Sequence, residues 1–228
     1  MQRIYDLFKL FKNILFNRYF FTRLNAIFSE YGYFKSKKAG CVDSDGNPVP
    51  WYTYPAIEYL QQFDFSGLTV FEYGSGNSSC YWASRALKVK SAEHNAPWFQ
   101  KFAERQTSYP NWQCVLQEKP QEYAAELNEK YDIIIIDAEW RDLCAREALK
   151  YIKDNGIIII DDTERVNSYP EYERALQTLR SDERFFQVDF YGFAPLVTYT
   201  KITTFFISRK CAFPRRSGPQ PQKGIGNF

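Results

Sequence analysis

Acidic side chains follow four short apolar runs in this chain of 228 residues. Glu72 and Glu93 end the first two runs, and Asp137 follows the third. The fourth run is followed by the pair Asp161-Asp162. Carboxylates can take a proton from a substrate, accept hydrogen bonds from hydroxyl groups, or hold a hard divalent cation. These five residues are therefore the first candidates for a functional site.

A glycine loop follows Glu72 and leads into a segment with a helical pattern. Glycines in this context let the backbone approach a ligand closely. Glu93 lies 21 residues beyond Glu72 and ends the next predicted strand, where a carboxylate can accept both ribose hydroxyls of a nucleoside. This spacing favours a nucleoside-cofactor site over a plain turn followed by a solvated acid. The loop residues are Gly74, Ser75, Gly76, Asn77, Ser78 and Ser79.

Two features of the loop bear on the cofactor. Ser79 stands where a dinucleotide fingerprint would have its third glycine. Glu72 precedes the loop, where its charge would repel a pyrophosphate but could accept a hydrogen bond from the ammonium of a methionine group. The charge favours S-adenosylmethionine over NAD, and an NAD-linked oxidoreductase remains the alternative enzyme.

Two isoleucine runs predict the centre of the fold. Ile133–Ile136 and Ile157–Ile160 do not alternate with polar residues, which is typical of parallel strands covered by helices on both faces. The 11 residues that join the last two predicted strands show no helical pattern, which favours an antiparallel closing pair. We therefore expect an α/β, doubly wound, mostly parallel seven-stranded sheet of the Rossmann-like type, with an N-terminal helical extension. The other strands are predicted at 68–72, 89–93, 112–116, 185–190 and 202–208. Helices are predicted after the glycine loop through Leu87, from Pro97, from Pro120, over 142–153 and at about 170–180.

Three segments resemble motifs of the class I S-adenosylmethionine-dependent methyltransferases. Val70-Phe-Glu-Tyr-Gly-Ser-Gly-Asn-Ser-Ser79 resembles motif I, Ser91-Ala-Glu-His94 the ribose-binding acid, and Tyr131-Asp-Ile-Ile-Ile-Ile-Asp137 the fourth-strand motif. The resemblance covers about residues 50–208. It implies that Glu72 and the loop from Gly74 to Ser78 hold the methionine end, that Glu93 binds the ribose, and that Gln117 and Glu118 lie near the adenine. His94 and Asp137 would flank the cofactor, and Trp51 and Tyr52 either close over it or belong to the core.

The acids after the fourth and fifth strands resemble a metal site. Asp137 with Asp161-Asp162 is similar to the Asp…Asp-Asn set of metal-dependent small-molecule O-methyltransferases. That set would hold Mg²⁺ or Ca²⁺ and acidify vicinal hydroxyls of an acceptor. The sequence departs from this pattern, because Trp140 stands where those enzymes have a basic lysine and the second acid is Asp rather than Asn. The alternatives are acids that face the acceptor without a metal, and acids that only cap backbone groups.

The remaining candidates for a catalytic role are few. His94 is the only histidine, so it is either a general base or a partly exposed structural residue. Methyl transfer needs mainly alignment and a deprotonated acceptor, so a strongly catalytic side chain is not required.

Charge is distributed unevenly along the chain. Residues 1–40 carry eight Lys/Arg and two Asp/Glu, and residues 209–228 carry five Lys/Arg and no acid, although the whole chain has a net charge of only +2. We expect a basic, aromatic helical extension that ends in a turn-rich loop at 35–50, together spanning residues 1–50. A catalytic domain at 51–210 and a disordered basic tail at 211–228 would follow. The extension has the apolar spacing of an amphipathic helix at Ile4, Leu7, Phe8, Phe11, Ile14 and Leu15.

The extension suggests either peripheral contact with an anionic membrane or packing as a lid or homodimer element through residues 1–40. No nucleic-acid partner is expected, because neither basic end resembles a binding module. Five cysteines without a CxxC pair are typical of a reduced compartment, so a cytoplasmic location is expected, with membrane association as the alternative.

The sequence thus predicts a methyltransferase for a small or carbohydrate-like hydroxyl acceptor. The loops near 45–55, 138–146 and 190–201 would select that acceptor. A catalytically inactive Rossmann-like scaffold that docks through its N-terminal helix is the alternative outside the enzymes.

Overall fold

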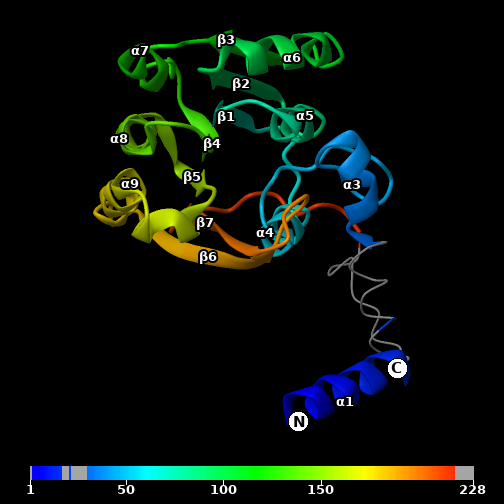
Figure 1. Cartoon of the computed structure of the whole chain (residues 1–228). Helices are drawn as coiled ribbons and strands as arrows, with labels where there is room; N and C mark the ends of the chain where they lie inside the picture. The colour runs from blue at the N-terminus through cyan, green and yellow to red at the C-terminus, as the bar shows by residue number, and fades with distance from the viewer. Residues whose placement is uncertain (1, 17–20, 22–29, 219–228) are drawn as a thin grey trace.

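The two isoleucine runs form neighbouring strands at the centre of one sheet, as predicted. In this computed structural model, residues 2–16, 21 and 30–218 are described, and they form a seven-stranded sheet with the order β3-β2-β1-β4-β5-β7-β6 (Figure 1). The strands are β1 (Thr69–Tyr73), β2 (Lys88–Glu93), β3 (Trp112–Leu116), β4 (Tyr131–Ile136), β5 (Ile152–Ile160), β6 (Phe185–Phe193) and β7 (Thr200–Ser208).

Strands β1 to β5 are parallel, and β7 is inserted between β5 and β6 and runs antiparallel to both. This confirms the predicted mostly parallel sheet with an antiparallel closing pair. In β7, Thr204 pairs with Ile160 at the end of β5. The first residues of β7 therefore lie beside the acids that follow β5.

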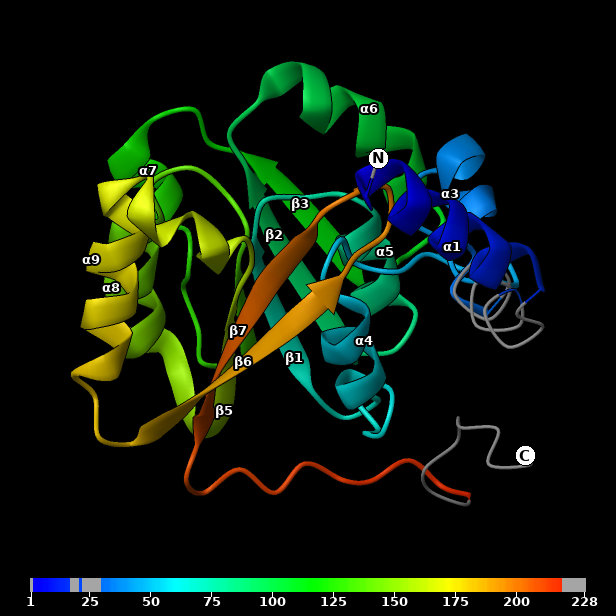
Figure 2. The ribbon, with the colours of Figure 1, turned by 60° about the horizontal axis from the view of Figure 1, so that its bottom comes forward.

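The isoleucines of β4 alternate between two apolar cores, because successive side chains of a strand point to opposite faces. Ile133 and Ile135 pack with α4 (Tyr54–Leu60), α5 (Asn77–Ala83) and part of α6 (Ala96–Gln106). Ile134 and Ile136 pack on the other face. The helices on that face are α7 (Pro120–Ala124), α8 (Arg141–Tyr151) and α9 (Pro170–Arg180) (Figure 2), and a 3-10 helix, η1 (Thr163–Asn167), precedes α9.

Two segments differ from the prediction. Residues 35–39 belong to α3 (Tyr33–Ala39) rather than to a loop, since the first helix-breaking residue in this stretch is Gly40. Residues 211–216 are ordered, in contrast to the predicted disordered tail. Phe213 is buried, and the backbone of Pro214 and Arg216 hydrogen-bonds to the segment between α4 and β1. Residues 219–228 lie outside the described part of the chain.

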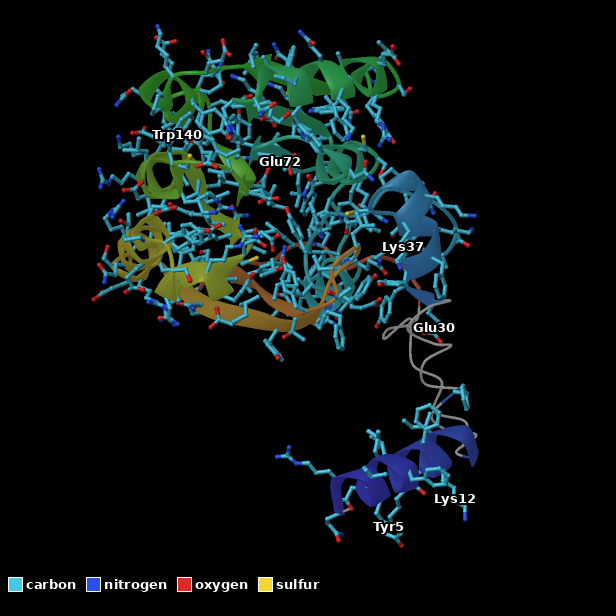
Figure 3. All side chains as sticks on the ribbon, in the orientation of Figure 1. Tyr5, Lys12, Glu30, Lys37, Glu72 and Trp140 are labelled. Carbon is cyan, nitrogen blue, oxygen red and sulfur yellow. The ribbon has the colours of Figure 1, made fainter. Side chains whose placement is uncertain are left out.

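The predicted N-terminal amphipathic helix is present as α1 (Gln2–Phe16). Its apolar side chains from Ile4 to Phe11 are exposed, Phe8 by 76% and Ile4 by 72%. Tyr5 and Lys12 mark this helix in Figure 3. Among the described residues, no helix is long and apolar enough to cross a membrane.

Candidate functional site

The carboxyl ends of the parallel strands open onto a cavity of about 860 Å³. That volume lies within the ~300–1,000 Å³ usual for ligand sites. Nearly all the residues predicted for the site line it. They are Gly74, Ser75, Gly76, Asn77, Ser78, Glu93, His94, Asp137, Asp161 and Asp162.

The glycine loop is fixed to the end of β4. Gly74 has φ of +100°, and a Cβ atom there would lie 2.3 Å from the backbone oxygen of Asp137. Only glycine fits this position without strain. A Cβ on Gly76 would instead meet the rings of Trp98 and Phe102 at 3.9 Å, which line the same cavity. Gly74 therefore lets the loop pack directly on the backbone at the end of β4.

Glu72 lies beneath the loop rather than on the cavity wall. Its side chain is 1% exposed, in the interior of the sheet domain (Figure 3). The Ser79 hydroxyl donates a short hydrogen bond to Glu72 Oε2 and accepts one from the Gly76 amide at 3.1 Å. Burial raises the pKa of Glu72 to about 8, against the opposing effect of hydrogen bonds from Ser78 and Ser79. Glu72 thus supports the loop, and its contact with a methionine group stays a prediction.

Glu93 joins the end of β2 to the glycine loop. Its Oε2 accepts hydrogen bonds from the amide and the hydroxyl of Ser75, both at 3.0 Å. Its Oε1 accepts from the amides of His94 and Asn95, both at 2.9 Å. A carboxylate has about four acceptor positions, so a ribose hydroxyl would take the place of the most easily rotated donor, the Ser75 hydroxyl.

His94 faces aromatic side chains rather than the aspartate cluster. Its ring centroid lies 5.3 Å from that of Trp140 and 5.9 Å from that of Tyr123, both edge-on. This position suits a residue beside a nucleoside better than a general base. Gln117 and Glu118, expected near the adenine, are not among the described residues that line the cavity; Gln117 donates to Glu126 at 2.9 Å.

The structure brings the three predicted aspartates together. Asp137, Asp161 and Asp162 each offer a carboxylate oxygen, and these oxygens lie within 4.8 Å of one another. Asp161 is 1% exposed, and Asp162 has a left-handed backbone with φ of 63°. The β-strand ends and this turn aim all three side chains at one point.

Lys201, at the start of β7, lies at that point and was not predicted. Its Nζ is 2.5 Å from Oδ2 of Asp161 and 2.5 Å from Oδ1 of Asp162. It also donates to the backbone oxygen of Trp51 at 3.0 Å. Burial lowers the pKa of Lys201, but the nearby carboxylates outweigh it and leave the pKa above its usual value. Lys201 is therefore a buried ammonium ion at neutral pH.

Other side chains complete the hydrogen bonding of the cluster. The Thr203 hydroxyl donates to Oδ1 of Asp161 at 2.7 Å. Arg165 Nη2 lies 3.1 Å from Oδ2 of Asp162, and Arg141 Nη2 lies 3.4 Å from Oδ1 of Asp137. Arg141 is itself held by the carbonyl of Ala138. Three acids thus meet three basic side chains.

The remaining walls of the cavity come from segments far apart in the sequence. Trp51 lines it, whereas Tyr52 is fully buried in the core. Asn77 Nδ2 donates to the backbone oxygen of Cys41 at 2.8 Å and so joins the end of α3 to the glycine loop. No motif marks this contact, since it joins residues 36 apart in the sequence. The lining residues that sequence reasoning missed are Lys38–Cys41, Asn95, Trp98, Lys101, Phe102, Arg105, Arg165 and Lys201.

Comparison with solved structures shows a shared fold. An O-methyltransferase from Bacillus cereus in complex with SAH has a TM-score of 0.54 and 17% identity, covering 73% of this chain and 86% of that one. TomG from Streptomyces achromogenes, an O-methyltransferase of tomaymycin synthesis in complex with SAM, has a TM-score of 0.53 and 14% identity, covering 67% of this chain and 76% of that one. Spermidine synthase from Thermotoga maritima has a TM-score of 0.51 and 15% identity, covering 68% of this chain and 59% of that one.

No protein-family model matches the sequence, and no curated protein matches it. The structural likeness, at this low identity, establishes the fold and leaves the reaction to be argued from the site. The chain has the Rossmann-like fold of the class I S-adenosylmethionine-dependent methyltransferases.

Proposed function

We propose that the protein is an S-adenosylmethionine-dependent methyltransferase that methylates a hydroxyl group of a small or carbohydrate-like acceptor. The observation that supports this most strongly is the position of Glu93. Its carboxylate accepts a hydrogen bond from the glycine loop, and the aspartate cluster lines the same cavity. A nucleoside subsite and an acidic acceptor subsite therefore share one space.

The residues present fit the cofactor. Gly74 lets the loop approach the end of β4 closely, and both Gly74 and Gly76 line the cavity. Trp98 donates to the backbone oxygen of Ser75 at 2.6 Å, so an aromatic ring stands beside the loop. Asn77 and Glu93 provide polar groups at opposite ends of the same loop. This arrangement can hold a ribose and a methionine group without any phosphate contact.

S-Adenosylmethionine supplies an activated methyl group on its sulfonium sulfur. The chain has to align an acceptor oxygen with that carbon and remove the hydroxyl proton as the new C–O bond forms and the C–S bond breaks. Asp137 is the candidate proton acceptor, since its side chain is 32% exposed while it lines the cavity. Arg141, on one of its oxygens, holds the carboxylate in place.

The acceptor side of the cavity combines aromatic and charged groups. Trp51 and Tyr199 line it and are 44% and 51% exposed. Exposed aromatic rings beside carboxylates suit a sugar-like molecule, which presents both apolar C–H faces and hydroxyl groups. Leu196 and Val197, in the predicted acceptor loop at 190–201, complete this wall.

The divalent metal suggested by the sequence does not fit the residues present. Lys201 already binds the oxygens of Asp161 and Asp162 that a metal would need. The proposal therefore assigns no step to a metal ion.

Isothermal titration with S-adenosylhomocysteine tests the proposed function. We expect saturable binding to the wild-type chain and a loss of about 10–100-fold in Glu93→Ala, the range that hydrogen bonds to a charged group supply. Glu104→Ala, an exposed acid on α6, is the control and should bind as wild type does. Binding of NAD with no response to S-adenosylhomocysteine would instead support the oxidoreductase alternative.

A further inference from the structure

We propose that the Lys201 ammonium is the resident cation of the aspartate cluster, standing where a divalent ion would have to bind, so that this site works without a metal. The inference deepens the proposed function, on which its meaning for catalysis rests. Its structural basis does not depend on that function, because it concerns only which cation the three carboxylates hold.

The Lys201 ammonium group lies between two carboxylates of the aspartate cluster. Nζ of Lys201 bridges Asp161 and Asp162 at 2.5 Å each, and its third donor goes to the Trp51 carbonyl at 3.0 Å. An ammonium group has three donors, so all are used. A divalent ion bound to these oxygens would sit ~2.0–2.6 Å from them, in the space that Nζ occupies.

The other oxygens of Asp161 and Asp162 also have donors. Thr203 donates to Oδ1 of Asp161, and Arg165 contacts Oδ2 of Asp162. Asp137 is paired with Arg141. Every oxygen of Asp161 and Asp162 therefore has a cationic or hydroxyl donor, with which a metal ion would compete.

The charges of the aspartate cluster are already balanced by basic side chains. Asp137, Asp161 and Asp162 are matched by Arg141, Arg165 and Lys201 in direct contact. A divalent ion added to this set would bring two positive charges with no carboxylate to balance them. Burying such an excess is unfavourable.

Lys201 and Thr203 both belong to β7. Residues two apart on a strand point to the same face, so both side chains of β7 reach Asp161. Lys201 is 3% exposed and Asp161 is 1% exposed. The antiparallel insertion of β7 beside β5 therefore builds the cation into the sheet itself. Lys201 acts here as a positioning residue, since it holds the acids that face the acceptor.

Removing the ammonium should expose a metal site. By calorimetry we expect no saturable Mn²⁺ binding to the wild-type protein. Lys201→Met should bind Mn²⁺ with a Kd at least about tenfold below the lower limit that the wild-type titration sets. Hard oxygen ligands suit Mn²⁺ as a probe. Adding Asp162→Asn to Lys201→Met should abolish the gain, and Lys201→Arg, which keeps the charge, should show none. Mn²⁺ should also raise the unfolding temperature of Lys201→Met and leave that of the wild type unchanged.

Two results would overturn the inference. One is Mn²⁺ binding to the wild-type chain that Asp162→Asn removes; the other is a folded Lys201→Met protein that gains no Mn²⁺ binding. If Lys201→Met does not fold, the wild-type titration and Lys201→Gln decide the question. A chain that shows the expected metal pattern but does not bind S-adenosylhomocysteine would refute the proposed function alone.

Discussion

At the scale of single residues, the site is held in shape by its own hydrogen bonds. Glu93 accepts hydrogen bonds from Ser75, His94 and Asn95. Such bonds hold the glycine loop in place before a ligand arrives, which lowers the entropy cost of binding. Of these donors, only the Ser75 hydroxyl can rotate away to admit a ribose hydroxyl.

Ser75→Ala should therefore have little effect on cofactor affinity. The variant loses a donor that the ribose would replace, while the Ser75 amide at 3.0 Å from Glu93 remains. We expect the Kd for S-adenosylhomocysteine, measured by calorimetry, to stay within about threefold of wild type, which is under 1 kcal/mol. Weakening by an order of magnitude would mean that the Ser75 hydroxyl itself contacts the cofactor.

Glu72→Gln should change how stability depends on pH. Burial raises the pKa of Glu72 from 4.5 to about 8 in the folded protein. Between these values the folded chain keeps a proton that the unfolded chain has lost, so the free energy of unfolding falls as pH rises from about 4.5 to about 8. Glutamine does not titrate, so its free energy of unfolding should not fall in this way. The difference in the free energy of unfolding between variant and wild type should therefore rise with pH, by about a few kcal/mol across the window.

Urea unfolding without cofactor at several pH values across that window measures the effect. Glu104→Gln, on the exposed surface of α6, should follow the wild type at every pH. A constant difference between Glu72→Gln and wild type across the window would contradict a buried acid with a raised pKa.

At the scale of elements, the last strand contributes more than closure of the sheet. β7 covers the edge of β5 and brings Lys201 and Thr203 to Asp161. The chain after β7 then continues along the segment between α4 and β1. There Phe213 packs edge-on against Phe63 and Phe65, each at 6.3 Å between ring centroids.

Phe213→Ala should destabilise the domain, although the residue lies in a segment predicted to be disordered. Its ring is 6% exposed, and buried Phe→Ala changes usually cost about 3–5 kcal/mol. Phe193→Ala, where the ring is 52% exposed, is the matched control and should cost well under half as much. Chemical denaturation of the two variants gives the comparison; equal and small losses would show that residues 211–216 are not packed.

The sheet could be predicted because its signals are local. Uninterrupted isoleucines in β4 and β5 indicate burial on both faces, and Pro97, Pro120 and Pro170 mark helix starts. The acids could be placed on one rim because parallel strands end at the same edge.

Lys201 could not be predicted in the same way. It reaches Asp161 across 40 residues through an antiparallel insertion. In the sequence it ends the predicted acceptor loop at 190–201, where no motif marks it. Phe213 was missed because its neighbours Pro214, Arg215 and Arg216 have the composition of a loop. Both depend on tertiary contacts that no local pattern reports.

At the scale of the whole molecule, α1 does not contribute to the cavity, because none of its described residues lines it. The apolar side chains of α1 from Ile4 to Phe11 are exposed, and contact of residues 1–40 with a membrane or a second copy stays a prediction. However, the end of this extension belongs to the site, since Lys38 to Cys41 line the cavity. We therefore expect the functional boundary to lie between α1 and α3 rather than at residue 51.

Two truncations test this boundary. Deleting residues 1–30 should leave the Kd for S-adenosylhomocysteine within about twofold of wild type, because no described residue of that segment lines the cavity. Deleting residues 1–50 removes the backbone oxygen of Cys41 that Asn77 binds, and should weaken binding or destabilise the fold. Equal affinity of both truncated proteins, with equal stability, would place the boundary at 51 after all.

A crystal structure of the protein with S-adenosylhomocysteine tests the proposed cofactor site most directly. We expect the ribose hydroxyls within hydrogen-bonding distance of Glu93, with the Ser75 hydroxyl displaced. The sulfur should face the side of the cavity that holds Asp137 and Lys201. A ligand bound away from Glu93, or with its sulfur turned from the aspartate cluster, would contradict the account.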